Sequence, residues 1–166
     1  MTPDIYRIRD LEPLRLAIMP RPRGAEWLED EVAGWANAGI RIVACLLHRY
    51  EIQELGISDE ERYCTRFGIE YRSHPIADRG VPERVTEFLE FTDTLASDVG
   101  RGSSVAIHCR AGIGRSSLTA GAVLLRLGVA APEIVPMISR ARGLGVPDTP
   151  QQAEWFAALC KSFSMT

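Results

Sequence analysis

Hydrophobic positions along the chain form short continuous runs separated by stripes at helical spacing. Runs at 14–18, 40–47 and 104–108, together with 69–76, are the strand candidates. The run at 40–47, rich in β-branched residues, reads as a strand buried on both faces, and the run at 104–108 reads as a short buried strand. Stripes with a period near 3.6 predict helices at 25–38, 58–67, 82–99, 116–127, 131–142 and 150–163. This alternation predicts an α/β fold with a central, mainly parallel sheet flanked by helices.

Some residues within these elements predict burial or a helix cap. The first helical stripe contains Trp27 and Trp35, which we expect in the core with Trp155. Ser58, with Glu61 three positions later, is typical of a capping box that starts a helix.

Length, composition and charge narrow the class of protein. The chain has 166 residues, which suits one domain, with an N-terminal strand and turn over 1–23 and a core over 24–164. The net charge of -3 favours neither nucleic acid nor an anionic membrane as a partner. The four cysteines are irregularly spaced, and the pattern of apolar residues leads us to expect neither a signal peptide nor a membrane-spanning segment. We therefore expect a reduced, monomeric, cytoplasmic protein.

The segment 108–116, His-Cys-Arg-Ala-Gly-Ile-Gly-Arg-Ser, joins a predicted buried strand to a predicted helix. Backbone N–H groups at a helix N-terminus lack intrahelical partners and carry the positive end of the dipole. A loop curled at that point therefore makes a cradle for an anion. Gly112 and Gly114 allow the backbone to turn its N–H groups inward.

The side chains of this loop suit nucleophilic attack on a phosphate ester. We expect the cradle and Arg115 to favour the thiolate of Cys109, the form that attacks. Arg115 can hold two phosphate oxygens in a bidentate fork. His108 is expected to orient the loop, and Ser116 to stabilise the sulfur as a leaving group. A lone cysteine more often packs in a core, but this combination of neighbours favours chemistry.

The pattern His-Cys-x5-Arg-Ser resembles the signature loop of the protein-tyrosine and dual-specificity phosphatases. The resemblance implies a phosphocysteine intermediate on Cys109, with no metal and no cofactor. It also implies that the loop binds the substrate phosphate, through Arg110, Ala111, Gly112, Ile113 and Gly114.

The leaving group needs a proton, and Asp78 lies in a loop between a predicted strand and helix. The segment 74–82 resembles the acid loop of the dual-specificity phosphatases, most closely the cyclin-dependent-kinase-associated phosphatase branch. A turn or capping role for Asp78 is the alternative. Asp148 is the competitor, because in low-molecular-weight phosphatases the acid follows near the C-terminus. Their cysteine lies near the N-terminus, however, so we favour Asp78.

Several polar residues allow two interpretations. Gln152 either closes a capping box with Thr149 or positions the hydrolytic water, and the first is favoured. Glu51 or Glu54 either braces Arg115 or lies on a solvated helix face, and the solvated face is favoured. Four arginines either ring the pocket or are ordinary surface and helix-end residues: Arg79, Arg110, Arg140 and Arg142.

The remaining cysteines and histidines carry weaker signals. Cys45, His48, Cys64 and His74 have no regular zinc-ligand spacing, so we expect no metal site. Cys45 or Cys64 would be candidates for a disulfide with oxidised Cys109, although core packing is favoured.

The predicted function is hydrolysis of phosphotyrosine, extending to phosphoserine and phosphothreonine, in phosphoprotein or phosphopeptide substrates. A phosphoinositide or small-molecule phosphatase is the alternative enzyme, but only one variable loop position, Arg110, is basic. A catalytically silent phosphoprotein-binding module is the non-enzymatic alternative, against which Cys109, Arg115 and Asp78 argue. Nucleotide hydrolysis is disfavoured because no Lys-Ser/Thr pair follows the last glycine.

Overall fold

The computed structural model describes residues 2–165. Its strands are β1 (Tyr6–Arg7), β2 (Leu16–Met19), β3 (Ile42–Cys45), β4 (Glu70–Ser73) and β5 (Val105–His108). Its α-helices are α1 (Leu28–Asn37), α2 (Arg49–Glu54), α3 (Glu60–Arg66), α4 (Val85–Gly100), α5 (Arg115–Arg126), α6 (Ala131–Arg142) and α7 (Pro150–Ser164). Each predicted helix and strand has a counterpart among them.

The five strands form one sheet in the order β1-β2-β5-β3-β4. The four longer strands run parallel, and only β1 pairs antiparallel, with Tyr6 opposite Ile18. The predicted mainly parallel sheet is confirmed. Strand β1 was not predicted, because a strand of two residues carries no readable periodicity.

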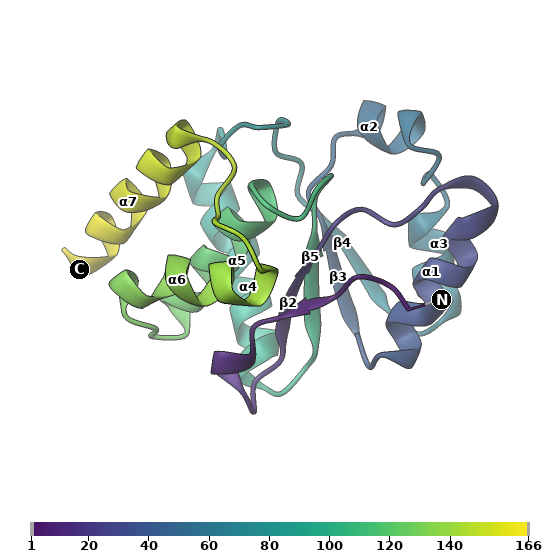
Figure 1. The fold of residues 1–166 in the computed structure, drawn as a ribbon, viewed down its shortest axis with the longest axis horizontal. Coiled ribbons are helices and arrows are strands. Elements are labelled where there is room, and N and C mark those ends of the chain that lie inside the picture. The colour runs from purple at the N-terminus through teal and green to yellow at the C-terminus, as the bar shows by residue number, and fades with distance from the viewer. Residues whose placement is uncertain (1, 166) are drawn as a thin grey trace.

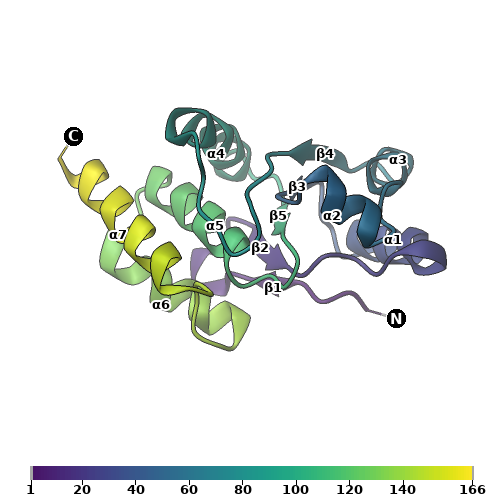
Figure 2. The ribbon, with the colours of Figure 1, turned by 90° about the horizontal axis from the view of Figure 1, so that it is seen from above.

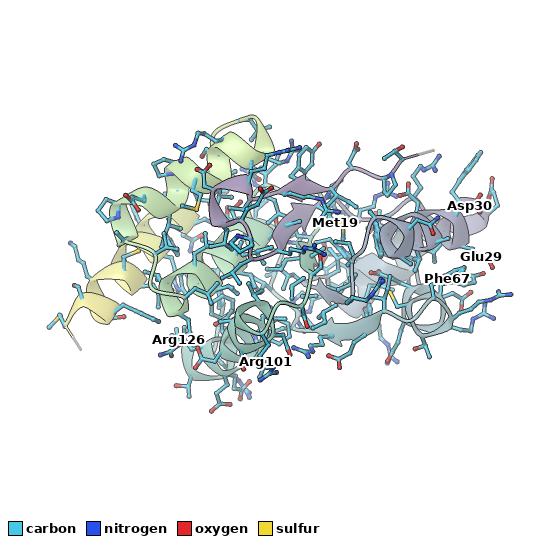
Figure 3. All side chains as sticks on the ribbon, turned by 90° about the horizontal axis from the view of Figure 1, so that it is seen from below. Met19, Glu29, Asp30, Phe67, Arg101 and Arg126 are labelled. Atoms are coloured by element: carbon cyan, nitrogen blue, oxygen red, sulfur yellow. The ribbon has the colours of Figure 1, made fainter. Side chains whose placement is uncertain are left out.

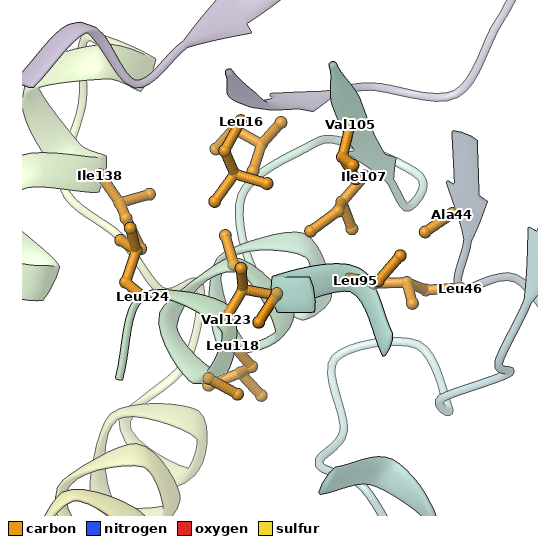
Figure 4. Close-up of a cluster of buried hydrophobic side chains, with 14 of the residues drawn as sticks. Leu16, Ala44, Leu46, Leu95, Val105, Ile107, Leu118, Val123, Leu124 and Ile138 are labelled. Carbon is orange, nitrogen blue, oxygen red and sulfur yellow. The ribbon is translucent and has the colours of Figure 1, made fainter. Parts of the chain in front are cut away.

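Helices cover both faces of the sheet. Helices α4 to α7 lie on one side, whereas α1, α2 and α3 lie on the other (Figure 1). The view from above shows the same separation (Figure 2). Two hydrophobic clusters fill the spaces between the layers. The larger one joins β2 and β5 to the α4–α7 side, through residues such as Leu16, Ile107, Leu118 and Val123 (Figure 4).

Strand β5 lies in the centre of the sheet, between β2 and β3. Because these three strands are parallel, their carboxyl ends meet at one edge, where ligands bind in open α/β sheets. The chain leaves β5 at His108, forms a loop and enters α5 at Arg115. Helix α5 is buried from Arg115 to Leu124, so the loop is attached to two rigid elements of the core.

Two details differ from the predictions. Trp27 precedes α1 and is 48% exposed, with the Arg23 guanidinium stacked 4.8 Å above its ring, so its assignment to the core was wrong. Trp35 is buried as predicted. Helix α3 begins after Asp59 without a side-chain cap, so Ser58 does not form the predicted capping box. Among residues 2–165, no helix is long and apolar enough to cross a membrane.

Candidate functional site

The loop between β5 and α5 packs against the end of β2. Gly112 has φ +71°, and a Cβ atom there would lie 2.6 Å from the Met19 carbonyl carbon. Met19 is fully buried and lies near the middle of the molecule (Figure 3). The backbone N–H of Arg21 donates to the carbonyl of Arg110 at 3.1 Å. Any side chain at position 112 would therefore displace the loop from β2.

Cys109 lies at the start of this loop, buried except for 3% of its surface. Its Sγ atom is 3.4 Å from the hydroxyl oxygen of Ser116. Within the described chain, the backbone N–H groups of residues 110–114 have no backbone or side-chain acceptor. These N–H groups belong to the loop that leads from Cys109 into α5. That they surround an anion next to the thiol stays a prediction.

The guanidinium of Arg115 is held from two sides. It donates to both carboxylate oxygens of Glu51 at 2.9 and 3.0 Å, and to the carbonyl of Ile76 at 2.9 Å. It also donates to Asp78 at 3.0 Å. Burial alone would lower the pKa of Arg115, but the hydrogen bond to Glu51 and the negative charges of Cys109, Glu51 and Asp78 raise it overall. Arg115 therefore stays a cation within the protein interior.

Glu51 is fully buried, so the favoured interpretation of a solvated face was wrong for this residue. Burial raises the pKa of Glu51, but the hydrogen bonds from Arg115 and from the His48 backbone more than reverse this, so its pKa is lowered. Glu54 lies on the solvated side, 64% exposed. Glutamates are rarely buried unless paired, which is why sequence reasoning favoured solvent for both.

Asp78 contacts Arg115 directly, whereas Asp148 lies beside Gly114 and pairs with Arg79. The Asp78 carboxylate is 45% exposed and accepts its hydrogen bond from Arg115, on the guanidinium nitrogen Nη2. The Asp148 carboxylate instead accepts from Arg79 at 3.3 Å. The structure thus brings Asp78 to the side chain that is expected to grip phosphate.

His108 faces the opposite side of the sheet from Cys109. Its Nε2 atom is 2.6 Å from Glu60 in α3, and its Nδ1 atom is 3.4 Å from the Cys109 carbonyl. Both His108 and Glu60 are buried. Burial lowers the pKa of His108, but the charge of Glu60, with a contribution from Cys45, raises it well above its ordinary value. Sequence reasoning did not identify Glu60.

Glu60 and His108 form a close group with Cys45, whose ligand atoms all lie within 4.8 Å of one another. Such a group is near enough to hold a metal ion, and it shares only Cys45 with the residues for which the sequence predicted no metal site. In this structure the Glu60 and His108 side chains are joined by their own hydrogen bond.

Gln152 caps α7. It accepts from the backbone N–H groups of Asp148 and Thr149 at 3.1 Å, and Thr149 accepts from the backbone of Gln152, so the predicted capping box is confirmed. Its amide also donates to the carbonyl of Gly80, at the end of the Asp78 loop. Its proposed contact with water stays a prediction.

The four surface arginines all have polar partners, Arg79 with Asp148, and their role in attracting a substrate stays a prediction. Arg110 lies 3.6–3.7 Å from Glu51 and Glu54, so its charge is partly neutralised. Arg140 pairs with Asp10 on the surface. Arg142 donates to the backbone of the loop from outside.

Cys45 and Cys64 are fully buried in the smaller hydrophobic cluster, as the core-packing interpretation predicts. Cys109 belongs to the larger cluster on the other face of the sheet. This arrangement argues against a direct disulfide between Cys109 and either residue.

Comparison with known proteins adds to this geometry. Rat cyclin-dependent kinase inhibitor 3 is 29% identical over 121 residues, covering 61% of this chain and 57% of its own. A putative tyrosine phosphatase of invertebrate iridescent virus 6 is 33% identical over 86 residues, covering 48% of this chain and 32% of its own. This chain therefore spans little more than half the length of the rat protein.

A solved structure supports the fold. Kinase-associated phosphatase, with its catalytic-site cysteine replaced by serine, superposes with a TM-score of 0.87 at 19% identity, covering 100% of this chain and 98% of that one. In addition, residues 28–135 match the protein family described as cyclin-dependent kinase inhibitor 3. This match covers most of the chain, so the protein belongs to the cyclin-dependent kinase inhibitor 3 family, within the protein-tyrosine and dual-specificity phosphatase superfamily.

Proposed function

We propose that the chain is a phosphatase that hydrolyses phosphotyrosine, and also phosphoserine or phosphothreonine, through a phosphocysteine intermediate on Cys109. One observation carries this proposal: the Cys109 thiol lies 3.4 Å from Ser116, at the start of a loop with N–H groups unpaired within the described chain, and this loop enters α5 at Arg115, whose guanidinium is fixed by Glu51. Such an arrangement stabilises both a thiolate and the transferring phosphoryl group.

In the first step, the thiolate of Cys109 attacks phosphorus and forms a sulfur–phosphorus bond while the bond to the ester oxygen breaks. The N–H groups of residues 110–114 and the guanidinium of Arg115 stabilise the equatorial phosphate oxygens. Asp78, in its protonated form, gives its proton to the leaving oxygen. The phosphate takes the hydrogen bond on Arg115 that Asp78 holds in the present structure.

In the second step, water attacks the phosphocysteine and loses a proton to the Asp78 carboxylate. The sulfur–phosphorus bond breaks, which releases inorganic phosphate and restores the thiolate. The Ser116 hydroxyl, 3.4 Å from the sulfur, donates a hydrogen bond as charge returns to it. The buried amide of Gln152 lies beside Gly114 and is the candidate for orienting this water.

The substrate class rests on the relatives and on the charge of the loop. The viral relative is named as a tyrosine phosphatase, and the family is named for kinase inhibition. Arg110 is the only basic residue among the variable loop positions, and it already faces Glu51 and Glu54. A highly charged inositol phosphate finds little extra positive charge there, so we favour a phosphoprotein.

The test is hydrolysis of an aryl phosphate, in the presence of a chelator, by the wild-type protein and by Cys109→Ser. We expect turnover by the wild type that is lost in the variant. A fully reduced wild type that binds phosphopeptide without hydrolysing it would instead establish a silent binding module. A panel of phosphopeptides and phosphoinositides then separates the two substrate classes.

A further inference from the structure

Several carbonyl groups of the loop accept hydrogen bonds from other parts of the chain. The Cys109 carbonyl faces His108, and the Arg110 carbonyl accepts from the Arg21 backbone. The next two carbonyls accept from one side chain: Arg142 donates from Nη2 to Ala111 at 3.3 Å and from Nε to Gly112 at 3.0 Å. Four consecutive carbonyls thus have partners, and three of them accept from Arg21 or Arg142, which lie far from the loop in sequence.

The orientation of these carbonyls determines where the phosphate-facing donors point. In a trans peptide unit, the carbonyl of one residue and the N–H of the next lie on opposite sides. Where the carbonyls of residues 109–112 point away from the anion cradle, the N–H groups of residues 110–113 therefore point into it. A donor that fixes an outward carbonyl also fixes an inward N–H.

Arg142 is well suited to act as such a donor. It is the last residue of α6, and Gly143 ends the helix with φ +82°. Its guanidinium lies 4.2 Å from the centre of the Tyr6 ring in β1, a cation–π contact that restricts its orientation. The side chain therefore joins α6 and the edge strand to the middle of the loop.

We propose that Arg142 is a positioning residue that holds the Ala111 and Gly112 peptides with their carbonyls outward and so preorganises the anion cradle. This inference rests on the proposed function, because the cradle matters for catalysis only if phosphate binds there. It does not require Arg142 to contact the substrate. Fixed donors bind an oxyanion more tightly than donors that must first be ordered.

Binding of inorganic tungstate, a phosphate mimic, tests this inference without requiring turnover. Isothermal titration calorimetry would compare the wild type with Arg142→Met, Arg142→Lys and Arg140→Met. Arg140 lies on the same helix and pairs with Asp10 on the surface, so Arg140→Met is the matched control for losing one positive charge. Thermal unfolding of each variant verifies that it is folded.

We expect Arg142→Met to weaken tungstate binding by about tenfold or more, since two charge-assisted hydrogen bonds are lost. Arg142→Lys keeps the charge but not the planar fork, and should weaken binding by more than about threefold. Arg140→Met should bind like the wild type. Binding within threefold of the wild type in either folded Arg142 variant overturns the inference, as does an equal loss in Arg140→Met.

The outcome is separable from that of the proposed function. If the wild type binds tungstate but hydrolyses no phosphate ester, the proposed catalytic function is wrong. The tungstate affinities of the Arg142 variants still decide whether Arg142 positions the loop. If hydrolysis occurs, kcat/KM should fall in parallel with tungstate affinity in the Arg142 variants. A loss of thermal stability alone, with unchanged tungstate affinity, would contradict the positioning role.

Discussion

The Asp78 carboxylate accepts a hydrogen bond from Nη2 of Arg115 and is 45% exposed. Phosphate competes for the same donor, so substrate binding should free Asp78 for proton transfer. Asp78→Asn keeps the shape but cannot give up a proton. We expect it to slow phenyl phosphate, whose leaving group is poor, by about a hundredfold or more, and to slow esters with good leaving groups far less.

The measurement is kcat for a series of aryl phosphates of increasing leaving-group acidity. Asp148→Asn is the matched control, because Asp148 is exposed and contacts Arg79 instead. Equal slowing across the series would remove Asp78 from the acid role. The same leaving-group dependence in Asp148→Asn would transfer that role to Asp148.

Glu51 is the second partner of Arg115, and here both charges are buried. Glu51→Gln leaves the Arg115 charge less compensated, which should lower the free energy of unfolding by about 3 kcal/mol at neutral pH. Because the pKa of Glu51 is lowered in the fold, its stabilisation is present above its ordinary value of 4.5 and is lost as pH falls through the lowered pKa. The gap between wild type and variant should therefore narrow in acid.

Chemical denaturation from pH 7 down to pH 3 measures this gap. Glu54→Gln changes the same residue type on the same short helix, but at an exposed site, and should alter stability little. A gap between wild type and Glu51→Gln that stays constant across this range would show that the Glu51 carboxylate does not titrate with folding.

At the scale of elements, α3 is tied to β5 by the buried pair of Glu60 and His108. Glu60→Gln should lower the free energy of unfolding by about 3 kcal/mol near pH 6, because it removes the charge that compensates the buried imidazolium. Glu61→Gln, on the exposed side of α3, is the control and should be near neutral.

The pH dependence of this pair has the opposite sign to that of Glu51. The pKa of His108 is raised in the fold, so its stabilisation is full below the ordinary value of 6.5 and is lost as pH rises toward the raised pKa. Cys45 and the ring of Trp35 also face His108. Wild-type stability relative to Glu60→Gln should therefore decline from pH 6.5 to 9. A difference that increases over this range would contradict a charged His108.

Features formed by residues close together in the sequence could be predicted, whereas features formed by residues far apart could not. Residues 108–116 are contiguous, so their residue types and spacing could be recognised together. Glu51 and Glu60 lie 64 and 48 positions from their partners, and nothing in the local pattern of either segment marks it as buried. Strand β1 was missed for a related reason, because its existence depends on pairing with β2. Pairing between distant polar groups depends on how the helices and strands pack, and the spacing of hydrophobic residues along the chain does not predict it.

At the scale of the whole molecule, the site lies where the two sides of the sheet meet. Arg115 begins α5, which packs in the larger cluster, and Glu51 comes from α2 on the other side. Arg21 and Arg142 reach the loop from two further regions. Since an anion in the loop contacts groups positioned by all of these, its binding should stabilise the molecule as a unit.

Inorganic phosphate should therefore raise the unfolding temperature. At about 100 times its dissociation constant, a ligand that binds only the folded state adds about 2.7 kcal/mol. For a chain of this size that corresponds to a rise in Tm of about 5–10 °C. Cys109→Ser should keep the rise, because the N–H donors and Arg115 remain. Asp78→Ala should increase it at equal phosphate, because the competing carboxylate on Arg115 is gone. Potassium chloride at the same ionic strength should give no comparable rise, and an equal rise would mean that general screening, rather than a bound anion, stabilises the fold.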